Sequence, residues 1–408
     1  MYDLNLTSEQ IEFRDTIREF VREKITPAAT QSERLEPFAK PLLIDLVDEV
    51  SQLGVRGLLL SETSGGIGAD ELTACLVLEE LAAGDVDLAV TLATSMLAAS
   101  HLLEPHLPNE RVAEILSRFG EDEQYHLAPA EINKRSRDGW SYHRADGVDR
   151  EPQLSLEQSD DGWRINGTMT EVPNAEIAKL LIFRFSGQGL CLIPRGTQGL
   201  ALETDENPFA KTTEDGEPAI RWQHGSLSDC IFKDCEIPGD CFIAEDKGNA
   251  DIFTAFNETR KVLMAAINLG VARAAYDSAI DYAKIRYQGG YNIIEHQGIG
   301  DKIAEMTVGL EASRTLVWKA AWIIRHPEAI ADGSVADLPY GTMAQSHAAE
   351  TANRVALLAA EHFGAMGVMR DMPLQKYVND SFMFLNADGH DSATRLKIAE
   401  TVAGFEPQ

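Results

Sequence analysis

The sequence predicts a mainly α-helical chain with a central β-domain. Helices are expected over residues 1–120, strands over 121–240 and a helical bundle over 241–408. In the first and last regions, apolar residues recur every three or four positions, which is the period of an amphipathic helix. The middle region contains short β-rich runs between Gly, Pro and charged turns. No internal repeat or low-complexity tract interrupts this α, β, α order.

The first region shows a helix start signal close to its beginning. Thr7 or Ser8 is expected to be the N-cap of the opening helix, and Pro27 is expected to end it. The glycine-rich stretch 64–68 is predicted to be a loop. A lone Gly-rich loop is weak evidence for phosphate binding, so we interpret it as a structural turn.

The middle region is predicted to be a small β-domain. Its strand signals are the runs LLIFRFS, LCLIPRG and CIFKDCEIP at 180–186, 190–196 and 230–238. The stretch 133–161 is rich in Arg, Asp, Ser and Gln, and we expect it to be a long surface excursion.

The last region contains two amphipathic helices separated by an arginine-containing turn. The first carries apolar residues at alternating steps of three and four from Val262 to Ala283. The segment Arg286-Tyr287-Gln288-Gly289-Gly290 breaks this period, which restarts at Ile299. Arg286 is therefore expected near a helix end or turn, where a guanidinium can meet a phosphate.

Composition narrows the possible partners. The 408 residues include 65 Asp and Glu against 36 Lys and Arg, so the net charge is −29. This charge argues against nucleic acid or an anionic membrane as a partner. We find no signal peptide and no uninterrupted run of about 18 apolar residues, so a soluble, cytoplasmic protein is expected. The 5 cysteines form no recognisable metal-binding spacing, so reduced buried thiols and no metal site are expected.

The chain resembles the acyl-CoA dehydrogenase family. Four C-terminal elements match the family's pattern in order, namely Thr259-Arg260, Tyr282-Ala283, Arg286 and Gln297. Residues 6–29 look like the family's opening helix and 61–85 like its Gly-rich turn and EELA helix, while 165–183 and 227–243 are similar to its central β-domain. The resemblance spans nearly the whole chain. It implies an N-terminal helical domain, a middle β-barrel-like domain and a C-terminal four-helix bundle.

The resemblance also implies a chemistry. In the family, a carboxylate removes the α-proton of an acyl-CoA thioester while a hydride leaves the β-carbon for FAD. Asp388 occupies the place of the family's C-terminal glutamate, and its side chain reaches about 1.5 Å less far, which matters for proton transfer. The other position used for the base in some members is Thr259 here, which cannot serve. His390 replaces a threonine, and with the neighbouring aspartates it is either an acid–base pair or a solvated polar turn.

Ligand contacts follow from the same resemblance. Arg286 and Gln297 match residues that contact the phosphate and adenosine side of FAD across a subunit interface, and Ser136 matches a serine of the family's flavin motif. Against FAD, Ala130 replaces a threonine near the flavin ring, and Glu171-Val172-Pro173 replaces an aromatic residue and a hydroxyl. Arg260, with Phe256 and Asn257, matches the CoA-binding neighbourhood, although a helix-surface salt bridge explains Arg260 equally well.

Three hypotheses stay open at this point. The first is an FAD-dependent acyl-CoA dehydrogenase of lipid metabolism, an oxidoreductase that passes electrons to an electron-transfer flavoprotein. The second is a flavin-free hydratase or lyase that acts on an acyl-CoA through Asp388 and His390. The third is a degenerate subunit of a heteromeric acyl-CoA dehydrogenase. The resemblance implies a tetramer in each case, either a homotetramer or a heterotetramer with a related subunit.

Overall fold

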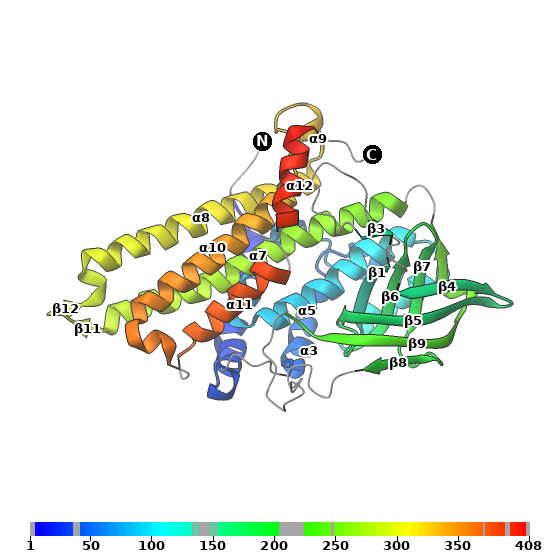
Figure 1. Cartoon of the computed structure of the whole chain (residues 1–408), viewed down its shortest axis with the longest axis horizontal. Helices are drawn as coiled ribbons and strands as arrows, with labels where there is room; N and C mark the ends of the chain where they lie inside the picture. The colour runs from blue at the N-terminus through cyan, green and yellow to red at the C-terminus, as the bar shows by residue number, and fades with distance from the viewer. Residues whose placement is uncertain are drawn as a thin grey trace.

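The computed structural model confirms the predicted fold class. It describes residues 5–35, 41–132, 135–136, 148–149, 153–203, 224–245, 249–369, 372–387 and 392–404. Helices are followed by strands and then by helices again, with the β-domain at one end of an elongated helical body (Figure 1). The elements change type between Glu121 and His126 and again between Ala244 and Asn249. The domain boundaries at residues 120 and 240 stay predictions.

The N-terminal region is built from helices whose ends follow from local sequence. They are α1 (Ser8–Phe20), α2 (Thr26–Ala29), α3 (Ile44–Gln52), α4 (Glu71–Gly84), α5 (Val86–Leu97) and α6 (Glu110–Glu121). Thr7 is the N-cap of α1, and its hydroxyl accepts from the backbone of Gln10 while the Gln10 side chain accepts from the backbone of Thr7. The prediction for Pro27 was wrong. A π-helical turn at Val21–Ile25 continues the chain into α2, where Pro27 lies in the first turn and needs no N–H partner.

Helix α5 lies in the protein interior. The segment Val86–His106 has the length and apolar composition of a membrane span, but 78% of it is buried inside the structure. A core helix of a soluble protein has the same character. The apolar composition of α5 is therefore explained by its contacts with the bundle and the β-domain.

The β-domain contains two four-stranded sheets. One has the order β1-β6-β7-β10, with β1 (His126–Ile132) parallel to β6 (Ala178–Phe185), then β7 (Gly189–Pro194) and β10 (Phe242–Ala244). The other has the order β4-β5-β9-β8, from β4 (Leu154–Ser159), β5 (Gly162–Pro173), β9 (Leu227–Pro238) and β8 (Leu200–Glu203). Two short strands, β2 (Arg135–Ser136) and β3 (Val148–Asp149), pair with each other. Strand β1 is thus an edge strand.

The predicted surface excursion at 133–161 was wrong for its last part. Leu154–Ser159 is a strand that pairs with β5, and Leu154 and Leu156 alternate with exposed residues so that both are buried. Alternation over so few residues is a weak signal next to many charged neighbours. Most of residues 133–152 lie outside the described residues.

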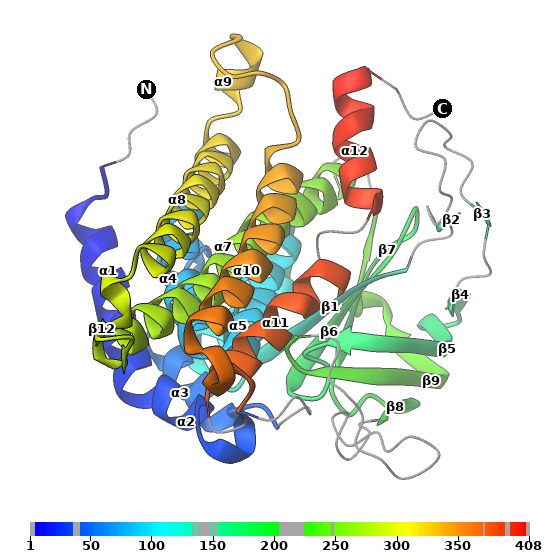
Figure 2. The same cartoon turned by 60° about the vertical axis from the view of Figure 1, so that its left-hand side comes forward.

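The C-terminal region is a bundle of long helices. These are α7 (Asn249–Ile285), α8 (Gln297–Arg325), α10 (Tyr340–Phe363) and α11 (Leu374–Ala387), with the shorter α9 (Glu328–Ala331) and α12 (Ser392–Ala403). Figure 2 shows the long helices side by side, with the β-domain beside them. Small residues allow close approach. A Cβ at Gly270 in α7 would lie 2.4 Å from the carbonyl oxygen of Glu79 in α4, so only glycine fits there.

Two apolar cores hold these parts together. One joins α1, α4 and α5 to the bundle helices, and the other joins α6 and the segment after α5 to the strands. Phe256 packs against both cores. All 5 cysteines are free and buried, as expected. Among the described residues, no group of three His, Cys, Asp or Glu side chains is placed to hold a metal ion.

Candidate functional site

The predicted catalytic segment lies between two helices. Helix α11 ends at Ala387 and α12 begins at Ser392, so Asp388 and His390 fall between them and lie outside the described residues. The middle of α11 contains a buried ion pair. Asp380 is 3% exposed and pairs over 2.7 Å with Lys376, one turn earlier in the same helix. The pair compensates both buried charges within α11.

His224, which lies just before β9, holds α11 to α5. The Nε2 of His224 lies 2.9 Å from the carbonyl oxygen of Asp380, which accepts the hydrogen bond, and its ring lies 4.4 Å from that of Phe384. Asp87 at the start of α5 lies 3.4 Å from the other ring nitrogen of His224 and accepts from the N–H of Gly225. His224 therefore joins α5, α11 and the strand entry at one point. No local sequence signal marks it.

The strand expected beside the flavin ring has a paired carboxylate. Glu131 in β1 pairs with Arg184, which also pairs with Glu245 over 2.7 Å. The guanidinium carbon of Arg184 lies 4.1 Å from the ring centre of Phe253. Glu131 and Glu245 thus share one guanidinium, so the two carboxylates keep one net negative charge beside this strand. Ala130 lacks the hydroxyl of the family's threonine. Strand β1 is an edge strand, and its outer edge is used at Leu127, whose N–H donates to Ser95 and whose carbonyl accepts from Asn174.

The end of β5 has a conformation set by an asparagine. Asn174 has φ 61°, and its buried amide donates to the carbonyl oxygen of Thr91 over 2.9 Å. This contact fixes the preceding Glu171-Val172-Pro173 against α5. Val172 is buried, whereas Glu171 is exposed with φ 57° and its N–H donates to Asp229. The Asp229 carboxylate therefore holds the backbone of the segment that replaces the family's aromatic residue and hydroxyl.

Arg286 and Gln297 form an exposed corner at the far end of the bundle. Arg286 follows the last residue of α7, as predicted, and its carbonyl accepts from Ile293 across the hairpin of β11 (Tyr287–Gln288) and β12 (Tyr291–Asn292). Gln297 is the first residue of α8, whose N-cap His296 provides no side-chain cap. Within the described part of the chain, the Arg286 side chain has no ion-pair partner. A free guanidinium beside a helix N-terminus favours an anion.

The predicted CoA-binding residues lie near the other end of α7. Phe256 is partly buried at the junction of the two cores, Asn257 is exposed, and Arg260 is half-buried and already engaged in a contact. Arg260 lies in α7 and Arg286 directly follows its end, 26 positions later. At a rise of 1.5 Å per residue, this separation is about 39 Å along the helix axis. Figure 1 shows the same separation, with the β11–β12 hairpin and the β-domain at opposite ends. One chain therefore cannot bring both arginines to one ligand-binding site.

Ser136 stands in the short strand β2, where its backbone pairs with Val148. Its side chain lies outside what the structure describes. Its predicted role toward FAD stays a prediction.

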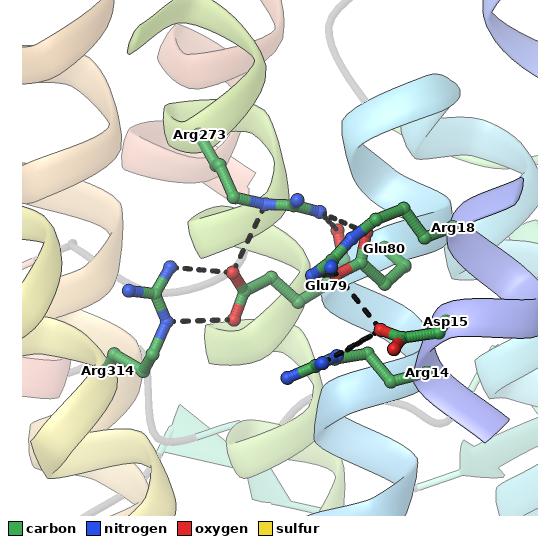
Figure 3. Close-up of polar contacts among 7 residues, drawn as sticks. All are labelled: Arg14, Asp15, Arg18, Glu79, Glu80, Arg273 and Arg314. Carbon is green, nitrogen blue, oxygen red and sulfur yellow. Dashed lines mark hydrogen bonds and ion pairs between the residues drawn. The ribbon is translucent and has the colours of Figure 1, made fainter. Parts of the chain in front are cut away.

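Glu79 and Glu80, interpreted from the sequence as structural, form the centre of a charge network (Figure 3). The Nη2 of Arg314 in α8 lies 2.7 Å from Glu79, and Glu80 meets Arg18 of α1 and Arg273 of α7 at the same distance. The network ties α4 to three other helices. These arginine partners could not be predicted from sequence patterns, because they lie far from Glu79 and Glu80 in the chain.

The residues expected at the pyrophosphate of FAD fit the cofactor more clearly than those expected at its flavin ring. The exposed cation of Arg286 and the uncapped start of α8 suit a pyrophosphate. The ring side offers the backbone edge of β1, used in part by Ser95 and Asn174, but no threonine hydroxyl at position 130. The residues at the phosphate end therefore fit FAD, whereas the ring end lacks the family's side-chain donor.

Comparisons with known proteins show the family of the chain. Residues 7–126 match the acyl-CoA dehydrogenase N-terminal domain, and residues 246–403 match the acyl-CoA dehydrogenase C-terminal domain. The short-chain specific acyl-CoA dehydrogenase of Clostridium acetobutylicum is 28% identical and aligns over 97% of this chain and 98% of its own. A 3-sulfinopropanoyl-CoA desulfinase of Paraburkholderia xenovorans is 27% identical over 98% of this chain and 97% of its own.

A solved structure supports the fold. The butyryl-CoA dehydrogenase of Megasphaera elsdenii superposes with a TM-score of 0.79 and 23% identity, covering 98% of this chain and all of that one (100%). At this identity the likeness concerns the fold alone. The matched domains nevertheless account for both helical regions of the chain.

Proposed function

Since the chain belongs to the acyl-CoA dehydrogenase family, we propose that it is an oxidoreductase that removes two hydrogens from the α and β carbons of an acyl-CoA thioester. The observation that carries this proposal is the end-to-end match to a short-chain acyl-CoA dehydrogenase, 28% identical over 97% of the chain. Both helical domains and the β-domain between them are present. The substrate's acyl group is not specified by that match.

Asp388 is the proposed base. The thioester carbonyl acidifies the α-proton, and a carboxylate in a poorly solvated site becomes basic enough to accept it. The contact of His224 with the carbonyl oxygen of Asp380 holds α11, which ends one residue before Asp388. A rigid lead-in of this kind matters because the aspartate is about 1.5 Å shorter than the family's glutamate and must be well placed.

FAD is the proposed cofactor, and when bound it supplies the hydride acceptor for the β-carbon. Arg286 would hold its phosphates, Gln297 its adenosine side and the β1 backbone its ring. Because the hairpin beside Arg286 and the β-domain that contains β1 lie at opposite ends of the chain (Figure 1), these contacts would come from two chains. We therefore propose that the site is completed by a second subunit, in a homotetramer or with a related partner subunit.

The remaining contacts follow the same scheme. Arg260 would place the CoA moiety, with Phe256 and Asn257 beside it. The half-buried guanidinium suits a CoA phosphate that approaches from solvent. The reduced cofactor would pass its electrons to an electron-transfer flavoprotein.

A second candidate function is a redox-neutral reaction on an acyl-CoA. It is favoured by the 27% identity to a 3-sulfinopropanoyl-CoA desulfinase, which shows a relative with a name outside dehydrogenation. The lack of a hydroxyl at Ala130 and the Asp229 carboxylate bonded to the backbone of Glu171 also fit it. In this case Asp388 and His390 would serve as acid and base for hydration or elimination.

Exchange of the α-proton tests the base. We expect purified enzyme to exchange deuterium from an α-deuterated acyl-CoA into water, followed by mass spectrometry, and Asp388→Asn to slow this exchange by at least about 100-fold. Acyl-CoA affinity should change little. Asp391→Asn is the matched control, since it removes a neighbouring carboxylate. Equal exchange by Asp388→Asn and the unmodified enzyme would eliminate the assignment.

A further inference from the structure

The β11–β12 hairpin at the far end of the bundle exposes two tyrosines. Tyr287 in β11 is 66% exposed, and Tyr291 in β12 is 58% exposed. Gly289 and Gly290 join the two strands, with φ angles of 67° and 97°. These angles are those of a type I′ turn, which requires a positive φ at both central residues. The turn itself carries no side chains, so the two tyrosines are the aromatic groups that this hairpin presents to solvent.

The register of the hairpin places Tyr291 on the same face as Arg286. Gln288 pairs with Tyr291, and the N–H of Ile293 donates to the carbonyl oxygen of Arg286 over 2.8 Å, which extends the ladder by one pair. Because side chains alternate between the two faces of a strand, Tyr291 shares a face with Arg286, and Tyr287 lies on the other. Arg286 and Tyr291 are diagonal neighbours across the two strands, a spacing of about 7–8 Å.

His296 fixes this face against the start of α8. Its Nε2 donates to the carbonyl oxygen of Gln288 over 2.9 Å, and its ring meets that of Tyr291 in a T-shaped contact with centroids 5.8 Å apart. A T-shaped contact involves at most one face of the Tyr291 ring. The other face is therefore open to a planar group, in line with the 58% exposure of this residue.

A cation and an open aromatic ring on one face suit an adenine nucleotide. The exposed guanidinium of Arg286 can form paired hydrogen bonds with a diphosphate. The ring of Tyr291 offers a surface on which a base can stack, since every base has a π-face. In FAD the adenine and the pyrophosphate are joined by one ribose, so both groups can meet the same face of the hairpin.

We propose that Tyr291 stacks on the adenine ring of the FAD whose pyrophosphate Arg286 would hold. The inference rests on the proposed FAD-dependent function and adds a residue that selects the adenosine half of the cofactor. Because the hairpin and the β-domain lie at opposite ends of the chain, the flavin half of this FAD would meet the β-domain of a second chain (Figure 1). Tyr287, on the other face of the hairpin, takes no part in the stack.

Equilibrium dialysis of FAD against the purified protein tests the proposal without requiring turnover. Tyr291→Leu should weaken FAD binding by about 10-fold, because the stack on the base is lost. Tyr291→Phe should stay within about 2-fold of the unmodified protein, because it keeps the aromatic ring. ADP, which carries the adenine and the diphosphate but no flavin, should lose the same factor in Tyr291→Leu when it competes with FAD.

The other tyrosine of the hairpin provides the matched control. Tyr287→Leu removes an equally exposed ring from the opposite face, so its FAD affinity should change by less than about 2-fold. Equal FAD affinity in Tyr291→Leu and the unmodified protein, or equal losses in the two leucine variants, would overturn the assignment. A change of assembly in Tyr291→Leu, seen by gel filtration, would assign the ring to a subunit contact and also overturn it. An unmodified protein that binds no FAD would instead refute the proposed dehydrogenase function on which the assignment rests.

Discussion

Removing one carboxylate from the α4 charge network is expected to destabilise the protein strongly. The change is Glu79→Gln, which keeps the side-chain volume and removes the charge. Glu79 has 8% of its side chain exposed, and Arg314 meets its two oxygens at 2.7 and 3.3 Å. The Nε of Arg273 lies 3.3 Å from the same carboxylate. Two guanidinium groups therefore depend on this charge (Figure 3).

The size of the expected loss in stability depends on the water and the ion-pair partners that Arg314 and Arg273 keep. Breaking a fully buried ion pair by removing one partner costs about 3–5 kcal/mol, because the other charge is left uncompensated. Arg314 and Arg273 keep 19% and 17% of their side chains exposed, and Arg273 retains its contact with Glu80. Water and Glu80 thus offset part of the cost. We expect a loss of about 2–3 kcal/mol in the free energy of unfolding.

Urea unfolding followed by circular dichroism measures this loss. The control is Glu311→Gln, which removes another partner of Arg314, but one whose side chain is 64% exposed. Its loss should stay below about 0.5 kcal/mol, as for other surface pairs. Equal midpoints for Glu79→Gln and the unmodified protein would refute the view that this network holds α4 to α7 and α8.

Three further predictions concern the cofactor corner, the β5 end and pH. Arg286→Glu should weaken FAD binding by about 100-fold in equilibrium dialysis, because a phosphate contact becomes a repulsion. Lys284→Glu, the same charge change two residues away, should alter it by less than about 3-fold. Asn174→Ala should lower the unfolding free energy by about 2–3 kcal/mol in urea unfolding, since it removes a buried amide donor and puts alanine at φ 61°, which asparagine tolerates better; Asn174→Gly should lose less, because glycine has no Cβ. Burial lowers the pKa of His126 to about 4 from its ordinary value of 6.5. Between pH 6.5 and pH 4, the imidazole is therefore protonated in the unfolded chain and neutral in the folded protein, so folding becomes less favourable as the pH falls. The urea midpoint should therefore fall from pH 7 to pH 5, and by less in His126→Asn; an equal fall in both would contradict this.

Periodicity was sufficient to predict the order of helices and strands. The apolar positions from Val262 to Ala283 and those that follow Ile299 lie largely on the buried faces of α7 and α8. Amphipathic spacing predicts such faces because it reflects packing directly. Thr7 was predictable as a cap, since capping is local. The continuation of the helical chain through Pro27 was not predictable, because the π-helical turn before it contacts α4, which is distant in sequence. Strand β4 was missed because two alternating leucines give a short signal.

The site was predictable only where the family motif is local. Arg286 and Gln297 stand at a helix end and a helix start, as the break in period indicated. Three contacts near the site join segments more than 50 residues apart. Glu131 and its partner Arg184 are 53 residues apart, His224 and Asp380 are 156 apart, and His101 and Thr259 are 158 apart. No periodicity reports such contacts.

The visible absorption spectrum of the purified protein, taken after incubation with FAD and gel filtration, tests the central claim most directly. A dehydrogenase should retain about one FAD per chain and lose its flavin absorbance when a suitable acyl-CoA is added, because the substrate's hydride reduces the cofactor. A protein that binds acyl-CoA but retains no FAD would contradict dehydrogenation. That result would favour the redox-neutral reaction at Asp388 and His390.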